Sequence, residues 1–277
     1  MSLATRRRPS GLLLLLSLIG AATFLYPLLL PALAGVGARP ARGGVETSLL
    51  FTGLGGICLV LLLLVLQERT LGGSAPGASG TLVGGGRTRV IALLGMLVAV
   101  DAALRLAPTL LGASPIFLLI ILVGFAYGAE IGFLMGALTL LVSALITGGL
   151  GPWLPYQMLG AGWMGMTAGW LPRWGEGGGR RELLLLTVFG ALWGLGYGAI
   201  LNLMEWPFAA PGLGARTGIY WTPDMGWAEA VTTYGRYYLV TSLSYDLFRS
   251  VANVLLIIAL GRPILRMLDR YLSLIHI

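Results

Sequence analysis

Apolar residues along this chain gather in long runs, separated by short polar or glycine-rich stretches. A helix needs about 20 mostly apolar residues to cross the hydrocarbon core of a membrane. Most of the runs approach that length, so the pattern predicts an all-α, polytopic transmembrane helical bundle. One run, at 115–128, is short for a complete crossing. The eight runs cover residues 11–33, 48–67, 90–108, 115–128, 129–147, 156–172, 183–204 and 237–261.

A Gly/Ser-rich stretch without apolar periodicity divides the chain. We interpret this stretch, residues 68–89, as a flexible cytoplasmic linker. It separates two N-terminal helices, within residues 1–67, from a six-helix core at 90–271. The first run follows three arginines, as in a signal peptide, but its length favours a retained helix. The last stretch, 272–277, resembles the translation of a DNA-library adapter and is predicted to be non-native.

Composition supports the membrane prediction. The chain is 57% hydrophobic and only 10% charged, whereas soluble domains carry about 25% charged residues. So few charges cannot cover a water-exposed surface, and lipid requires no such cover.

The arginines are distributed unevenly between the two sides that eight crossings create. Because Arg-rich loops remain in the cytoplasm, we predict cytoplasmic termini in a bacterial-type inner membrane. The arginines on the cytoplasmic side account for the net charge of +7. We therefore expect no nucleic-acid partner. The richer side holds Arg6, Arg7, Arg8, Arg69, Arg87, Arg89, Arg173, Arg180, Arg181, Arg262, Arg266 and Arg270, and the poorer side Arg39, Arg42, Arg216 and Arg236.

The residue inventory excludes several enzyme classes. The chain has no lysine, hence no P-loop lysine and no Schiff-base lysine. Its one histidine, His276, lies in the suspect tail, so Ser–His and HExxH proteases are excluded. The lone Cys58 lies in an apolar run and is read as a small hydrophobe. We therefore predict no enzyme, no cofactor and no metal site.

Two outward segments carry candidate binding residues. Residues 148–158 combine bend-forming Gly and Pro with Trp153, Tyr156 and Gln157, which suit a cavity wall; an interfacial aromatic belt is the equal alternative. Residues 205–236 include Tyr220 and Trp221 and are interpreted as a lid over a cavity, or else as a surface cap.

Polar residues inside the spans are the next candidates, because such residues are costly in a membrane and face the bundle interior. Asp101 and Arg105 are four apart and can pair within one helix, and a functional role is the equal alternative. Asp246, Arg249 and Asn202 are predicted to form the floor of the cavity, at the outer ends of their helices.

Small residues at a spacing of four form a ladder on the third run. Such a ladder permits close approach by another helix. We predict that it is a partner interface, and packing against another helix of the same bundle is the alternative. Its members are Gly95, Ala99, Ala103 and Ala107.

Three of these features together resemble a known family. They are the Ala99-x-x-x-Ala103 pattern, the Gly-rich passage 124–136 (GFAYGAEIGFLMG) leading to 143–147 (SALIT), and the segment 151–158 (GPWLPYQM). The six-helix block is similar to the S components of energy-coupling-factor (ECF) vitamin transporters. The third feature is the most specific and resembles the outward loop of a subgroup associated with cobalamin uptake.

The resemblance implies a function and partners. An S component binds a vitamin on the outer side, then topples in the membrane against a T subunit driven by two ATPases. In that family the Ala-x-x-x-Ala pattern contacts the T subunit. The two N-terminal helices exceed the usual six-helix unit, and the long 205–236 segment suits a bulky substrate.

Two alternatives remain open. A membrane-embedded transferase acting on a lipid-linked substrate would need a carboxylate pair, and Glu205, Asp224 and Glu229 form no recognisable motif. A secondary transporter would show inverted repeats with matching broken helices, which the sequence does not display.

Overall fold

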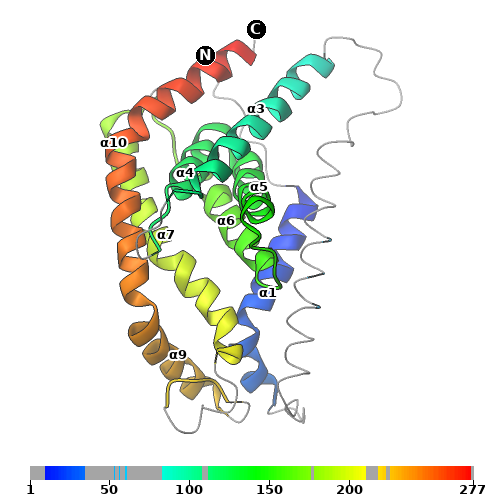
Figure 1. Cartoon of the computed structure of the whole chain (residues 1–277), viewed down its shortest axis with the longest axis vertical. Coiled ribbons are helices and arrows are strands. Elements are labelled where there is room, and N and C mark those ends of the chain that lie inside the picture. Colours follow the sequence, from blue (N-terminus) through cyan, green and yellow to red (C-terminus); the bar gives the residue numbers. More distant parts are fainter. Residues whose placement is uncertain are drawn as a thin grey trace.

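The structure, a computed structural model, describes residues 10–34, 53, 56, 60, 83–107, 112–175, 178–209, 218–222 and 225–275. Every regular element within these residues is a helix (Figure 1). The elements are α1 (Gly11–Ala34), α3 (Val83–Leu104), α4 (Ile116–Tyr127), α5 (Ala129–Thr147), α6 (Leu154–Ala168), α7 (Arg180–Glu205), the 3-10 turn η1 (Trp206–Phe208), α9 (Trp227–Thr241) and α10 (Leu243–Ile275).

The predicted fold class is confirmed. Helix α5, helix α7 and the part of α10 from Leu243 to Tyr271 are each long and apolar enough to cross a membrane. The predicted helix at 48–67, with Cys58, lies outside the described residues apart from three isolated positions, and so does His276.

Helix α4 is the centre of the bundle. Each of its residues from Ile116 to Phe125 is buried, which fits a helix that is apolar on all sides. Its 12 residues span about 18 Å at 1.5 Å per residue, too short to cross a membrane of about 30 Å alone. It meets α5 at Gly128, whose φ of 95° is a conformation that favours glycine.

The Gly-rich passage 124–136 has a packing role. A Cβ atom at Gly124 or at Gly132 would collide with the carbonyl oxygen of Gly165 on α6, and one at Gly136 would collide with that of Ala161. Helices α4, α5 and α6 therefore approach one another closely enough that only glycine fits at these positions.

Helix α1 packs against the six-helix block. The ring of Phe24 lies 5.6 Å from that of Tyr156 and 5.2 Å from that of Trp163, both on α6. The indole N–H of Trp163 also donates a hydrogen bond to the Ser17 hydroxyl at 3.1 Å. At least the first of the two extra N-terminal helices is thus part of the same packed bundle.

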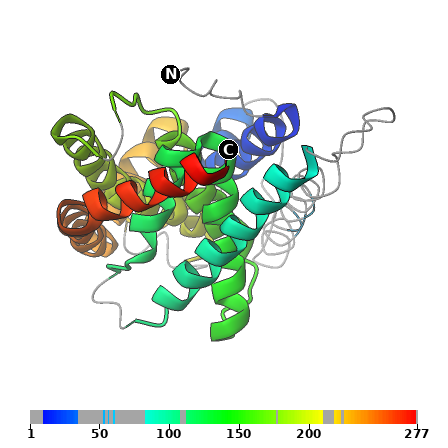
Figure 2. The same cartoon turned by 90° about the horizontal axis from the view of Figure 1, so that it is seen from above.

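The bundle is tied together at the end where α10 finishes. The guanidinium of Arg173 donates to both oxygens of Asp269 at 2.8 and 3.0 Å and to the carbonyl of Ala126 at 3.2 Å. The Tyr127 hydroxyl donates to the carbonyl of Leu268. Beyond Pro263, inside the helix, the last part of α10 runs across this end of the bundle (Figure 2).

Two predicted boundaries need correction. Helix α3 begins at Val83, so the last part of the predicted linker is helical. The run at 237–261, predicted as one helix, is divided between two: α9 ends at Thr241 and α10 begins at Leu243. The Thr241 hydroxyl donates to the carbonyl of Tyr237 and contacts the Ser242 hydroxyl at 2.9 Å, and such side-chain bonds compete with a continuous helix.

Candidate functional site

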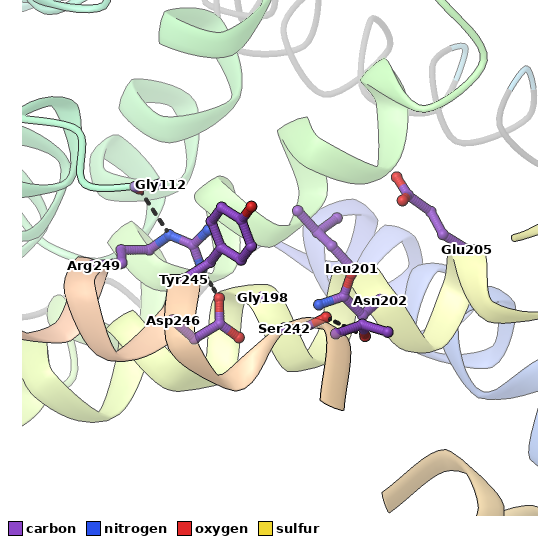
Figure 3. A pocket seen from close by; sticks show the side chains of 10 residues that line it. Gly112, Gly198, Leu201, Asn202, Glu205, Ser242, Tyr245, Asp246 and Arg249 are labelled. Atoms are coloured by element: carbon purple, nitrogen blue, oxygen red, sulfur yellow. Dashed lines mark hydrogen bonds and ion pairs between the residues drawn. The ribbon is translucent and has the colours of Figure 1, made fainter. Parts of the chain in front are cut away.

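A pocket lies between the end of α7 and the start of α10 (Figure 3). Arg262, Arg266 and Arg270 lie toward the other end of α10. Its volume is about 280 Å³, at the lower limit of the ~300–1,000 Å³ typical of small-molecule sites. Most of its lining residues carry a polar side chain. The lining residues are Gly112, Gly198, Leu201, Asn202, Glu205, Thr241, Ser242, Tyr245, Asp246 and Arg249.

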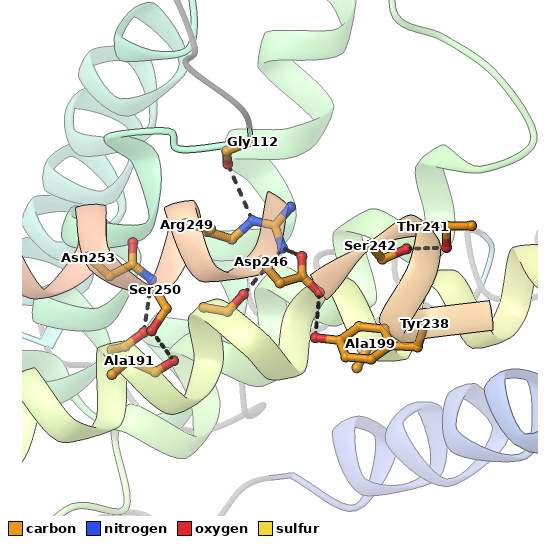
Figure 4. Close-up of polar contacts among 12 residues, drawn as sticks. Gly112, Ala191, Ala199, Tyr238, Thr241, Ser242, Asp246, Arg249, Ser250 and Asn253 are labelled. Carbon is orange, nitrogen blue, oxygen red and sulfur yellow. Dashed lines mark hydrogen bonds and ion pairs between the residues drawn. The ribbon is translucent and has the colours of Figure 1, made fainter. Parts of the chain in front are cut away.

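An ion pair forms one side of the pocket. Arg249 and Asp246 are in direct contact, and the other oxygen of Asp246 accepts a hydrogen bond from the Tyr238 hydroxyl at 2.9 Å (Figure 4). Arg249 also donates to the carbonyls of Gly112 and Gly194, each at 3.3 Å. These bonds join α7, α9, α10 and the turn before α4, so the pair holds the pocket's shape.

Aromatic rings complete the surroundings of Arg249. Its guanidinium carbon lies 5.9 Å from the ring centre of Phe117 and 5.4 Å from that of Tyr197. Both distances are within the range of cation–π attraction. The charge of Arg249 is thus satisfied by a carboxylate, two carbonyls and two ring faces.

A glycine stripe on α7 lets α10 approach this closely. Gly190, Gly194 and Gly198 are spaced by four and lie on one face. A Cβ at Gly194 would collide with Ser250, and one at Gly198 with the carboxylate of Asp246. In the space that the glycines leave, Asn253 donates to the carbonyl of Gly190 and Ser250 to that of Ala191, both at 2.9 Å.

Asn202 and Glu205 line the pocket without a partner among the described residues. Within the described part of the chain, neither the Asn202 amide nor the Glu205 carboxylate makes a hydrogen bond or ion pair. They are three residues apart on the pocket face of α7, which leaves both available to a ligand.

The structure brings together three of the predicted substrate-binding residues. Asn202, Asp246 and Arg249 all line the pocket. Trp153, Tyr156 and Gln157 do not. Trp153 is 43% exposed and Tyr156 only 1% exposed, packed on Phe24.

Gln157 is connected to the pocket indirectly. Its backbone carbonyl accepts the Tyr197 hydroxyl at 3.5 Å, and the Tyr197 ring lies against Arg249. The start of α6 therefore supports the pocket through Tyr197 rather than lining it.

The predicted lid segment, 205–236, has a small core of its own. Trp206 is buried, and its indole N–H donates to the carbonyl of Ile219 at 2.9 Å. The ring of Tyr220 lies 6.0 Å from that of Tyr237 on α9, and Trp221 packs against the same cluster. Tyr220 and Trp221 thus belong to an aromatic cluster beside the pocket and not to its lining.

Sequence reasoning missed several lining residues. Glu205 was considered only as a catalytic carboxylate, and Tyr245 and Ser242 were not singled out. The spacing of Gly190, Gly194 and Gly198 was the available signal. Such a stripe predicts a close helix partner, and polar residues on that partner would then have drawn attention.

The expected Asp101–Arg105 pair is wrong. Asp101 accepts a hydrogen bond from the Thr139 hydroxyl, and Arg105 donates to the Ser143 hydroxyl, each at 2.9 Å. The two hydroxyls are one turn apart on α5, so each charged side chain finds a nearer partner across the helix interface than along its own helix.

Three members of the small-residue ladder lie on the outer face of α3, and the fourth, Ala107, follows the end of the helix. Its four members are exposed, whereas Leu97, Val98, Asp101 and Ala102 on the other face are buried. A Cβ added at Gly95 would meet nothing within 4 Å. The ladder is therefore free to contact another protein. Its members are Gly95, Ala99, Ala103 and Ala107.

Metal binding finds no support in the described residues, among which no three His, Cys, Asp or Glu side chains converge. Comparison with family models gives a match to the substrate-specific component of ECF transporters over residues 89–261. Comparison with curated proteins and with solved structures gives no significant match.

Proposed function

Because this chain belongs to the family of ECF transporter substrate-specific components, we propose that it captures a small water-soluble vitamin or related micronutrient in the pocket between α7 and α10. The observation that carries this proposal is that Asn202 and Glu205, which have no partner among the described residues, lie one turn apart in the same pocket. Polar groups inside membrane proteins are costly and mark substrate sites.

The pocket has the construction expected of a rigid binding site. The Arg249–Asp246 pair and the glycine stripe fix the two helix faces on which the free polar groups lie. A preorganised site avoids the cost of ordering its side chains when the ligand arrives. The pair supplies the framework, and Asn202 and Glu205 supply the ligand contacts.

The pocket's position fits uptake from outside. It lies at the start of α10, whereas Arg262, Arg266 and Arg270 follow at the other end of the same helix. The positive-inside rule assigns that arginine-rich end to the cytoplasm. The pocket then opens toward the outer face, with both chain termini inside.

Pocket size supports a micronutrient smaller than cobalamin. A volume of about 280 Å³ suits a compact ligand, since even drug-sized molecules occupy ~300–1,000 Å³. Cobalamin, the ligand that the 151–158 segment suggests, is far larger than this volume and would require the pocket to widen. Cobalamin therefore remains a test ligand, and a compact one is favoured.

The exposed ladder on α3 supports a second part of the proposal. Its small residues offer a flat helix face for a transmembrane T subunit, which two ATPases would drive. The chain itself has no lysine for a nucleotide-binding P-loop, which agrees with this division of labour.

Replacing Ala99 or Ala103 by leucine should lower complex assembly and uptake at least about tenfold, a loss of 1.4 kcal/mol. The larger side chain prevents close helix approach. Substrate binding by the isolated chain should be unchanged, because neither Ala99 nor Ala103 lines the pocket. Co-purification with the T subunit and uptake into vesicles measure the first effect, and calorimetry measures the second.

Ala259→Leu is the matched control, because Ala259 is exposed on the membrane-crossing part of α10 and is not in the ladder. It should leave assembly intact. Unchanged assembly and uptake in both ladder variants would contradict the proposed interface.

A further inference from the structure

We propose that the pocket selects a small organic cation, whose positive charge lies beside Glu205 and whose hydrogen-bonding group meets Asn202. This inference rests on the pocket being the capture site, and it adds the chemical class of the substrate. Three features of the lining carry it: the charges, the unpartnered amide and an exposed aromatic ring.

The charges of the lining residues do not cancel. The described lining holds two carboxylates, Asp246 and Glu205, and one guanidinium, Arg249. Asp246 and Arg249 neutralise each other by direct contact. Glu205 carries the remaining negative charge, and a cationic ligand would balance it.

An anionic ligand finds no free cation here. Arg249 is the single cation among the described lining residues, and it is engaged by Asp246, by two backbone carbonyls and by two aromatic faces. To bind a carboxylate or phosphate, Arg249 would have to leave the bonds that join α7 to α10. The ligand's negative charge would also lie near that of Glu205, and like charges in one site repel.

The remaining groups suit a cation that bears a polar substituent. The Asn202 amide offers both a donor and an acceptor one turn before Glu205, on the same face of α7. Tyr245 is 49% exposed at the pocket, and an aromatic face attracts organic cations. Figure 3 shows Asn202 between Glu205 on one side and Tyr245 with Arg249 on the other. A compact molecule can reach all three free groups.

The test is calorimetry on the purified full chain with small organic probes of different charge. The probes are thiamine and choline as cations, biotin and pantothenate as anions, and riboflavin as a neutral molecule. At least one cation should bind more tightly than every anion and the neutral probe. Glu205→Gln should then lower the affinity for that cation between about tenfold and a hundredfold, the loss expected for a charged hydrogen bond.

Glu229→Gln is the matched control, since Glu229 is exposed in the first turn of α9 and outside the pocket lining. It removes the same charge from the same end of the molecule, and affinity should change less than about twofold. Thermal unfolding of each unliganded variant reports on folding independently.

The other outcomes separate the two proposals. If an anion or the neutral probe binds best, or if Glu205→Gln leaves cation affinity unchanged, the cation class is overturned while the capture function stands. If none of the probes and no other water-soluble vitamin binds the parent protein, the capture function itself is refuted, and the cation class with it.

Discussion

Replacing Arg249 by alanine is expected to lower the free energy of unfolding by about 3–5 kcal/mol, the loss typical of breaking a buried ion pair. The substitution leaves Asp246, which is 1% exposed, with only the Tyr238 hydroxyl as partner. It also removes the donors to the carbonyls of Gly112 and Gly194. Thermal unfolding in detergent, followed by tryptophan fluorescence, measures the effect.

A double variant separates the stranded charge from the lost bonds. Arg249→Ala combined with Asp246→Asn removes the uncompensated carboxylate and should recover part of the stability. The two backbone carbonyls remain without their donor, so recovery should be incomplete. If the single variant is as stable as the parent, the pair does not hold α7 to α10, and the framework described above is incorrect.

The second large effect is expected at Gly165 on α6. A Cβ there would collide with the carbonyl oxygen and the Cα of Gly132. Because the collision is with backbone, no rotamer change relieves it, and α5 and α6 must separate. Gly165→Ala should therefore destabilise the protein by about 3 kcal/mol, the upper end of the range for overpacking.

Gly196→Ala provides a control of opposite sign. Gly196 lies inside α7, and a Cβ there would meet nothing within 4 Å. Alanine is the better helix former by about 1 kcal/mol, so this variant should be equally or more stable. Equal destabilisation of both variants in the same unfolding assay would contradict the close packing of α5 on α6.

The hydrophobic pattern predicted the helices well where apolar runs end at strong signals. Gly148 has a φ of 69° at the end of α5, and the predicted 129–147 helix has those bounds. The pattern failed at Ser242, because apolar residues continue on both sides and the interruption depends on hydroxyl bonds. It also could not show that α4 is central, because a short apolar run has the same sequence pattern whether it faces lipid or protein.

The site was predictable in part for a physical reason. Asp246, Arg249 and Asn202 stand out because polar residues in an apolar helix are costly and seek one another. Trp153 and Tyr156 were grouped with them on composition alone, which does not report direction. Tyr156 packs on Phe24 of α1 instead, and Trp153 is exposed. Glu205 could be recognised as a pocket residue only from the structure, in which α10 lies beside α7.

The central claim is that substrate binds between α7 and α10, and filling the pocket tests it most directly. Asn202→Trp should occupy much of the space of about 280 Å³, and Leu184→Trp adds the same side chain at a position on α7 that is 67% exposed. Equilibrium binding of the vitamin that the parent protein binds best, with cobalamin in the panel, is the measurement. The account predicts loss of binding in Asn202→Trp and parental affinity in Leu184→Trp, with both variants folded. Parental affinity in a folded Asn202→Trp protein would contradict it.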